Sequence, residues 1–415
     1  MRSGSTSFAS ATLFIYFPSM LMSMGQGMII PALPTIGLTF GVSGAIAVQA
    51  VTSQLIGRTV SMIPAGALVD RYGTRPLMIS GASLATVSTL IAAFSPSFVI
   101  ILITQFFWGI GMSMWMFGRE IAAFDMVKRD QRGRQMSALM GIGSTGMAFG
   151  PAIGGFLTDF TGIRGLFLVY TATAFIVLLL SIAQKEQSKR SSVPTKTKFF
   201  DVQAFKQIHP YFRITYAILF YSTIVQFTRV QVVNTMLPLY SQDQLGYSAS
   251  TSGLIFTVAG IATFAMIAPT GFISDKIGRK WAAGMAAVSS AIAFIAFPLA
   301  TSLPELMIAA VIVGIANGLA LGAMTIYTYD IVPSHVRGQL QAVRRSVGEL
   351  GALTSPPVAG LISATYSPGV TFWFFAPLHV LSAFLIFAIG RESLQGKRGE
   401  NAPSTEEIDK GYSPE

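Results

Sequence analysis

The chain has 415 residues, of which 52% are hydrophobic and 11% are charged, with a net charge of +10 and a mean hydropathy of +0.60. Soluble domains carry about 25% charged residues, so the composition excludes a water-soluble globular protein and indicates a protein of the lipid bilayer. The chain has no cysteine, which excludes disulfides, and its three histidines are scattered. Its basic residues fall in short clusters between apolar runs, which favours membrane loops over nucleic-acid binding. We therefore expect no nucleic-acid partner, no metal and no cofactor.

Twelve apolar stretches are long enough to cross a bilayer as helices, which takes about 20 residues. The first stretch is much longer than the core of a signal peptide and no small-residue cleavage site follows it, so we expect it to stay in the mature protein. The stretches lie at about 9–38, 44–69, 76–95, 97–124, 135–159, 163–184, 211–240, 248–273, 281–300, 303–329, 339–365 and 370–391.

The loops between these stretches alternate in charge. One set is basic and includes "DRYGTRP", "KRDQRGR" and "DKIGRK", whereas the other set has Arg164 as its one basic residue. Because basic loops stay on the cytoplasmic side, the pattern predicts a multi-pass protein of the cell membrane with both termini in the cytoplasm.

Two polar segments divide the chain. Residues 185–209 are charged and contain Pro194, so we expect a cytoplasmic linker between an N-terminal bundle (1–184) and a C-terminal bundle (210–395). Residues 396–415 lack apolar periodicity, which predicts a disordered cytoplasmic tail.

The two halves repeat each other at a fixed offset of 205 residues. The offset relates Gly41 to Gly246, Gly66 to Gly271, Asp70 to Asp275, Gly73 to Gly278, Arg75 to Lys280, Gly109 to Gly314, Asp125 to Asp330, Pro151 to Pro356 and Gly155 to Gly360. Transporters use parallel repeats of this kind to place a site between two moving bodies. The repeat predicts an all-α integral membrane protein of twelve helices in two pseudo-symmetric six-helix bundles.

Four segments resemble motifs of the major facilitator superfamily. "GALVDRYGTRPL" resembles its loop 2–3 motif and "GFISDKIGRK" the matching loop 8–9 copy. "GSTGMAFGPAIGG" (143–155) and "MGQGMIIPALP" (24–34) resemble the fifth and first helices of its drug:proton antiporter branch. The resemblance implies the major facilitator fold, a transporter and not an enzyme, and a monomer. The fourth helix departs from the family, because Gln105 stands where an arginine linked to proton coupling is usual.

The resemblance implies a cytoplasmic gate at the loop motifs. In the family the loop aspartate faces a helix N-terminus, and Asp125 would accept an ion pair from Arg71 or Arg75. The alternative is ordinary flanking charge, but an aspartate in both copies favours the gate. The expected gate residues are Gly66, Asp70, Arg71, Gly73, Arg75, Asp125, Gly271, Asp275, Gly278, Lys280 and Asp330.

The fifth stretch carries glycines at spacings of three and four. Gly143, Gly146, Gly150 and Gly154 share one smooth helical face, with Pro151 and Gly155 beside it. Such a face lets helices approach closely, and we expect an interface that moves during transport; static packing is the alternative. The literal G-x-G-x-x-G at 141–146 lies within an apolar helix, so it does not predict dinucleotide binding.

A few charged residues lie within the spans, where each costs at least about 2.5 kcal/mol at the bilayer centre and usually marks a pathway. The candidates are Arg58, Arg119, Glu120, Arg229, Arg345 and Glu349. Arg345 and Glu349 are four residues apart, so a purely structural ion pair is an alternative for them. If a proton is carried, Glu349 is the expected carrier because it lies deepest.

These observations leave two transport functions open. The first is secondary active export of an amphipathic small molecule by alternating access, driven by protons. The second is uptake or exchange of an organic anion, favoured by the excess of arginine over acid in the spans and by Gln105. A membrane enzyme or sensor is not expected, because the sequence has no nucleophile–base pattern, P-loop or soluble domain.

Overall fold

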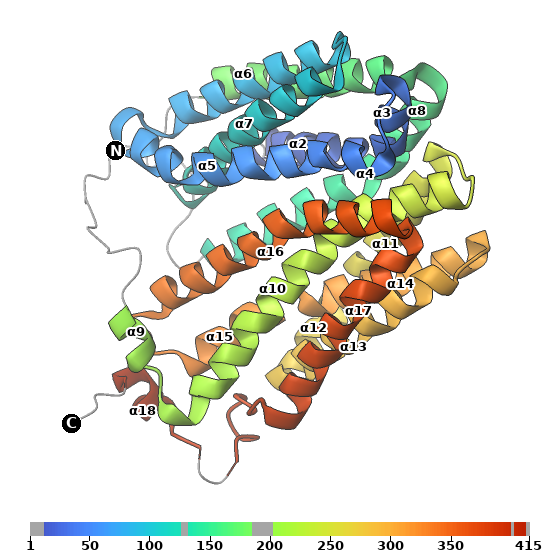
Figure 1. Cartoon of the computed structure of the whole chain (residues 1–415). Coiled ribbons are helices and arrows are strands. Elements are labelled where there is room, and N and C mark those ends of the chain that lie inside the picture. Colours follow the sequence, from blue (N-terminus) through green and yellow to red (C-terminus); the bar gives the residue numbers. More distant parts are fainter. Residues whose placement is uncertain (1–11, 126–131, 185–201, 400–401, 412–415) are drawn as a thin grey trace. The chain divides into compact units, whose positions relative to one another are not determined.

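The computed structural model describes residues 12–125, 132–184, 202–399 and 402–411, and the secondary structure within these ranges is helical, without a strand (Figure 1). The long helices are α2 (Phe17–Ile29), α3 (Leu33–Phe40), α5 (Gln49–Tyr72), α6 (Thr74–Ala93), α7 (Phe98–Asp125), α8 (Arg132–Ala183), α10 (Pro210–Leu239), α11 (Ala249–Ala265), α13 (Arg279–Ala296), α14 (Leu303–Ala320), α15 (Ala323–Ile331), α16 (Arg337–Thr365) and α17 (Pro368–Phe384). Short helices are α4 (Gly44–Ala47), α9 (Val202–Lys206), α12 (Ile267–Phe272) and α18 (Thr405–Lys410).

The helices match the twelve predicted spans. The first, second, eighth and tenth spans are each built of two consecutive α-helices, and α8 holds the fifth and sixth, which meet at Gly162 with a φ of 67°. Among the described residues, eight helical segments are long and apolar enough to cross a membrane, and the one from Gly141 to Ala183 covers two spans. The remaining three spans are α5, α10 and α16, and these are helices that carry the predicted intramembrane charges. The all-α fold is confirmed.

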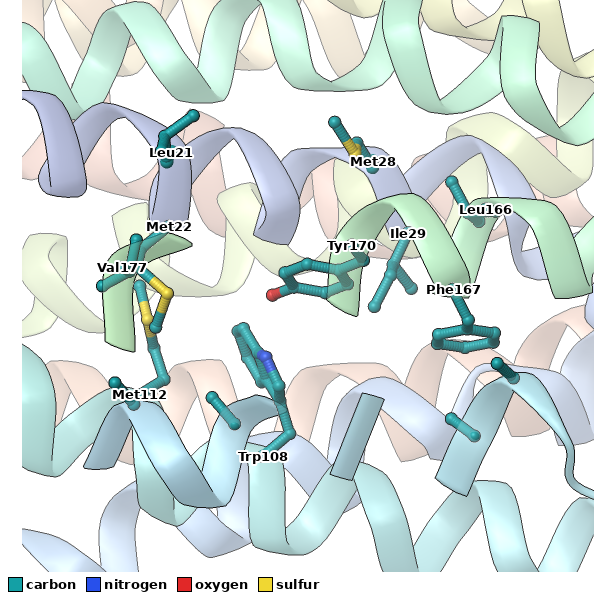
Figure 2. Close-up of a cluster of buried hydrophobic side chains, with 14 of the residues drawn as sticks. Leu21, Met22, Met28, Ile29, Trp108, Met112, Leu166, Phe167, Tyr170 and Val177 are labelled. Carbon is teal, nitrogen blue, oxygen red and sulfur yellow. The ribbon is translucent and has the colours of Figure 1, made fainter. Parts of the chain in front are cut away.

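The described residues form two compact units. The first comprises residues 1–194 and 237–260. Its core lies between α2, α7 and α8, where Trp108, Phe167 and Tyr170 are at most 1% exposed and Trp108 packs against Tyr170 with ring centroids 5.7 Å apart (Figure 2). Gly25 of the "MGQGM" segment faces this tyrosine, and a Cβ there would lie 2.1 Å from its ring. The glycine therefore makes room for the core aromatic.

The second unit comprises residues 195–236 and 261–415. Its core joins α10, α15 and α16 through buried side chains that include Phe212, Tyr327 and Leu340. The hydroxyl of Tyr216 donates to the Leu340 carbonyl at 2.9 Å, which ties α10 to α16. The unit therefore has a core of its own.

The C-terminal tail differs from the prediction of disorder. Residues 405–410 form α18, whose capping box joins Ser404 and Glu407, and the side chain of Ile408 is 2% exposed in the core of the second unit. Asp409 lies 3.6 Å from Arg337 at the start of α16. One apolar residue in a polar segment gives no periodicity, so the sequence pattern could not reveal this docked turn.

The unit boundaries also differ from the predicted bundles, because residues 237–260 group with the N-terminal helices. The cause is close packing of α8 against α11: a Cβ at Gly155 would lie 2.2 Å from the Ala249 carbonyl oxygen, and one at Gly253 would lie 2.2 Å from that of Pro151. Asp159 of α8 also accepts hydrogen bonds from the backbone N–H groups of Ala249 (3.2 Å) and Ser250 (2.8 Å) at the start of α11. A segment of the second sequence half thus completes the first unit.

Candidate functional site

The first copy of the loop motif turns at Gly73, whose φ of 90° favours glycine. Arg75 donates from Nη2 to the Ile182 carbonyl at 2.6 Å near the end of α8, and Arg71 lies over the ring of Tyr72 at 5.2 Å. A cation beside the last carbonyls of a helix is favourable. The remaining predicted gate residues of this copy, Gly66, Asp70 and Asp125, lie outside the residues whose side chains are described, so the expected pair with Asp125 stays a prediction.

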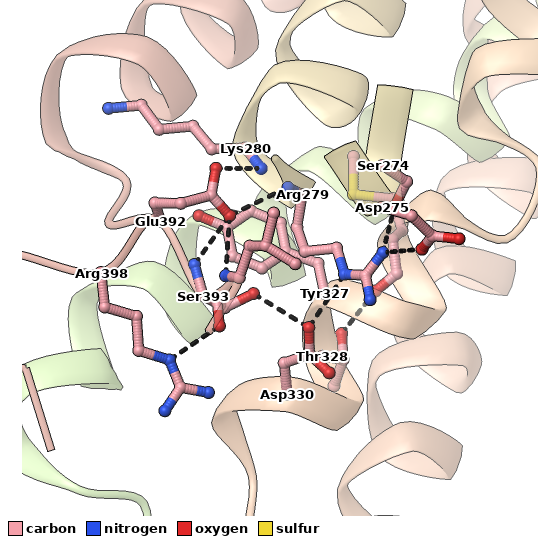
Figure 3. Close-up of polar contacts among 12 residues, drawn as sticks. Ser274, Asp275, Arg279, Lys280, Tyr327, Thr328, Asp330, Glu392, Ser393 and Arg398 are labelled. Atoms are coloured by element: carbon pink, nitrogen blue, oxygen red, sulfur yellow. Dashed lines mark hydrogen bonds and ion pairs between the residues drawn. The ribbon is translucent and has the colours of Figure 1, made fainter. Parts of the chain in front are cut away.

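The second copy forms a connected polar network (Figure 3). Arg279 lies 2.5 Å from an Asp275 oxygen and 3.0 Å from an Asp330 oxygen, so one guanidinium joins two predicted gate aspartates. It also donates to the Ser274 hydroxyl at 2.9 Å. The predicted cation of this copy was Lys280, which contributes its backbone N–H instead, at 3.2 Å from Glu392.

Glu392 closes the network from the chain segment after α17. Its carboxylate accepts from the backbone N–H of Arg279 at 2.9 Å, at the N-terminus of α13, where an anion is favourable. Gly278 (φ 146°) makes this approach feasible, because a Cβ there would lie 2.1 Å from Glu392 Oε2. Gly271, in contrast, faces open space.

Arg279 and Glu392 are the site residues that sequence reasoning missed. The first copy has Thr74 at the position equivalent to Arg279, so the repeat did not single it out. Its spacing of four residues from Asp275 was the available signal. Glu392 lies far along the chain from the motif, and no local pattern connects it to α13.

The predicted glycine face of α8 packs against α2 in a regular series. Cβ atoms at Gly146, Gly150 and Gly154 would lie 2.3, 2.4 and 2.2 Å from the carbonyl oxygens of Met20, Met24 and Met28, respectively. Gly143 is looser, with its nearest atom, Ser23 Oγ, at 3.4 Å. Beside this face, Gly155 and the carbonyl group of Pro151 meet α11. The antiporter-like segment is therefore packed backbone to backbone on two sides.

The intramembrane charges of the first unit lie on α5 and α7. Arg119 is 5% exposed, 3.7 Å from the Glu120 carboxylate, and 5.4 Å from the centroid of the Trp115 ring. Arg58 is half-buried on α5. Gln105, which replaces the family's arginine, is 2% exposed, and its Oε1 has no hydrogen-bond partner among the described residues.

The charges of the second unit differ more from expectation. Arg345 is exposed and Glu349 is half-buried, whereas Arg344, their neighbour on α16, is 4% exposed and donates to Thr223 and Gln341.

Arg229 on α10 is 3% exposed and donates to the hydroxyl of Ser290 at 2.5 Å and to the side-chain oxygen of Asn317 at 2.7 Å. Both partners are neutral. Among the described residues, no carboxylate lies within 4 Å of either Arg229 or Arg344. The second unit therefore holds two buried cations that no acidic side chain of the described chain neutralises.

A metal site has no support within the described ranges, where no group of three His, Asp or Glu side chains could hold an ion. The chemistry available at the candidate site is ionic recognition, hydrogen bonding and close helix packing.

Comparison with known proteins adds a family and several relatives. The model of the family described as Major Facilitator Superfamily matches residues 15–251 and 219–410. Multidrug resistance protein 2 of Bacillus subtilis (strain 168) is 24% identical over 85% of this chain and 88% of its own length. The sialic acid transporter NanX of Escherichia coli (strain K12) is 24% identical over 78% of this chain and 79% of its own length.

The fold is shared with solved structures. A crystal structure of a D-xylose–proton symporter superposes with a TM-score of 0.77 at 17% identity, over 95% of this chain and 100% of that chain. At this identity the likeness concerns the fold alone.

Proposed function

Because this chain belongs to the major facilitator superfamily and is a membrane transporter, we propose that it exports an amphipathic small molecule in exchange for protons. The observation that carries the proposal is the backbone-to-backbone packing of α8 against α2 and α11, made by Gly146, Gly150 and Gly154 on one side and by Gly155 on the other. These are the residues of the segment that resembles drug:proton antiporters. The relative in Bacillus subtilis is named a multidrug resistance protein, which agrees with this substrate class.

In this proposal the two bundles alternate between open states on either side of the membrane, and the solute crosses between them. The gate network at Arg279 and the Arg75 contact at the end of α8 hold the cytoplasmic ends of helices while the outer side is open. Glu349, a half-buried carboxylate on α16, carries the proton, because a carboxyl group can bind and release one as its surroundings change.

Transport in inside-out vesicles tests the proposal. With ethidium as the fluorescent amphipathic probe, we expect accumulation that requires an inwardly acidic pH gradient and disappears on adding an uncoupler. Glu349→Gln should abolish this dependence, because the amide cannot carry a proton, while Glu406→Gln on the exposed side of α18 should behave like the native protein. Full gradient dependence in Glu349→Gln would remove Glu349 as the carrier.

Carriage of an organic anion is a second candidate function, favoured by the buried and un-neutralised Arg229 and Arg344. A relative named a sialic acid transporter agrees with it. In the same vesicles, uptake of radiolabelled benzoate that ignores the pH gradient and is competed by other carboxylates would favour this function over proton-driven export.

A further inference from the structure

A small cavity lies within the second unit, lined by residues of α10, α13, α14, α15 and α17. The lining residues that matter here are Ser222 and Arg229 from α10, Ser290 from α13, and His379 from α17. Arg229 lies ten residues before the end of α10, or about 15 Å along the helix axis, which places the cavity within the depth of the membrane.

The charge of Arg229 has dipoles around it but no counter-charge. Ser290 and Asn317 accept hydrogen bonds from Nη1 and Nη2, and both are neutral. A buried charge without an opposite partner is costly, and proteins place such charges in a membrane chiefly where a ligand or pathway needs them. We therefore expect Arg229 to bind an anion that does not come from the described part of the chain.

Two further polar atoms at this cavity also lack partners among the described residues. They are Nε of Arg229 and Nε2 of His379, on side chains that are 3% and 2% exposed. Leaving a buried polar group unpaired costs about 1–3 kcal/mol. The His379 ring is held edge-on against Phe294, with centroids 4.5 Å apart, so its orientation is fixed by packing.

We infer that this cavity binds the anionic group, a carboxylate or other small oxyanion, of the solute that the protein transports. Arg229 supplies the positive charge and N–H donors, and His379 supplies a further hydrogen bond. The cavity is small, so only a small charged group of a solute can enter it, and not a whole amphipathic molecule. The inference rests on the second candidate function, carriage of an organic anion, since it names the residues that would hold the anionic group.

Binding can be measured without transport. We would place the purified full-length protein in phosphatidylcholine nanodiscs and follow thermal unfolding with increasing sodium benzoate, using neutral benzamide as the matched probe at equal ionic strength. Benzoate should raise the Tm in a saturable manner, and benzamide should not. Arg229→Gln should weaken the apparent benzoate affinity at least tenfold, and His379→Gln should weaken it severalfold.

The control variant is Lys276→Gln, which removes one exposed positive charge outside the cavity and should keep the native benzoate response. Arg229→Gln should unfold at the native temperature or above it without benzoate, because the uncompensated charge is gone; this distinguishes a lost site from a misfolded protein. A saturable benzoate response that persists in Arg229→Gln, or equal responses to benzoate and benzamide, would overturn the inference.

Two further outcomes are informative. One distinguishes a lipid headgroup from a solute as the source of the anion, and the other distinguishes anion binding from transport. If phosphatidylglycerol nanodiscs raise the Tm of the native protein and remove its benzoate response, the oxyanion is a lipid headgroup, and the assignment to a solute is overturned. If benzoate binds through Arg229 but does not move in vesicles, the anion site stands and the carriage of an organic anion fails.

Discussion

At the scale of single residues, the contacts between α8 and α2 depend on missing side chains. Gly146, Gly150 and Gly154 leave no room for even one methyl group, because methionine carbonyl oxygens lie where the Cβ atoms would be. Backbones this close gain dispersion contacts along the whole helix pair. The glycines are therefore needed for this packing.

Gly150→Ala should destabilise the protein, because its Cβ would lie 2.4 Å from the Met24 carbonyl oxygen. Overpacking of this kind costs about 1–3 kcal/mol. The matched control is Gly141→Ala on the same helix, where nothing lies within 4 Å and a helical alanine is favoured over glycine. Thermal unfolding in detergent would measure both variants. Equal Tm values for them would contradict the packing described here.

Arg279→Gln should loosen the second loop motif, because Asp275 and Asp330 lose their shared cation. Charged hydrogen bonds of partly exposed groups suggest a loss of about 1–3 kcal/mol, together with slower transport. Lys280→Gln, a neighbouring change that keeps the backbone bond to Glu392, should have little effect. If Lys280→Gln impairs transport more than Arg279→Gln does, the lysine is the functional cation of this loop.

Residue-level prediction reached its limit where neighbouring residues are chemically alike. The sequence predicted charges on α16 but favoured Arg345, whereas packing buries Arg344. Two adjacent arginines cannot be distinguished by residue type. Only the rotation of the helix about its axis, which is set by packing against its neighbours, decides which one faces inward. The glycine face of α8 was predictable, because a spacing of three and four residues fixes one side of a helix whatever lies opposite.

At the scale of elements, the short helix α18 contributes a side chain to the core of the second unit. It has six residues, and its single buried apolar side chain, Ile408, joins the core of the second unit. Burial of such a side chain contributes about 1.5–3 kcal/mol relative to exposure. The tail therefore closes one end of this unit's core.

Ile408→Ser should release α18 and lower the Tm, while Glu406→Ala on the exposed face should leave α18 docked. Limited proteolysis within residues 402–411 would detect the release. Resistance to cleavage in Ile408→Ser, equal to that of the native chain, would mean that other contacts hold the tail.

The cap of α18 adds a dependence on pH. The backbone N–H of Ser404 donates to Glu407 and lowers the pKa of that carboxyl group. A lowered pKa in the folded state stabilises α18 above the unfolded pKa of about 4.3, and this stabilisation is lost as the pH falls through the folded value. Hydrogen exchange of the α18 amides, corrected for intrinsic rates, should therefore accelerate below about pH 4 in the native chain. Glu407→Gln should show a smaller change over that range, and an identical change would exclude Glu407 as the cause.

Element boundaries were predictable where apolar length sets them, and less so at breaks. The sequence placed all twelve spans, but gave no sign that α11 ends before Met266 or that α14 and α15 part at Gly322 (φ 81°). Breaks of this kind depend on neighbouring helices that supply partners for the freed backbone groups. The sequence repeat, in contrast, is matched by the backbone conformation of equivalent glycines. Gly41 and Gly246 both have positive φ, as do Gly73 and Gly278.

At the scale of the whole molecule, the orientation predicted from charge places loop 8–9 in the cytoplasm and the turn near residue 244 outside. Because the chain has no cysteine, single thiols can be introduced at Lys276 and Gln244 without background. A membrane-impermeant maleimide on intact cells should label Gln244→Cys and spare Lys276→Cys until the cells are opened. Labelling of both positions in intact cells would overturn the orientation and the parallel repeat.

The seam between α8 and α11 has a mechanical consequence. Along it, Gly155 faces the Ala249 carbonyl, Gly253 faces that of Pro151, and Gly260 faces the side chain of Ala148. Large side chains would interdigitate, and sliding one helix past the other would require each of them to leave its groove. An interface of glycine and alanine has no interdigitating side chains, so small shear displacements of one helix along the other meet little steric resistance. The movement with the lowest steric cost for this helix pair is therefore sliding along the helix axes. The hydrogen bonds between Asp159 and the start of α11 limit how far the helices can slide.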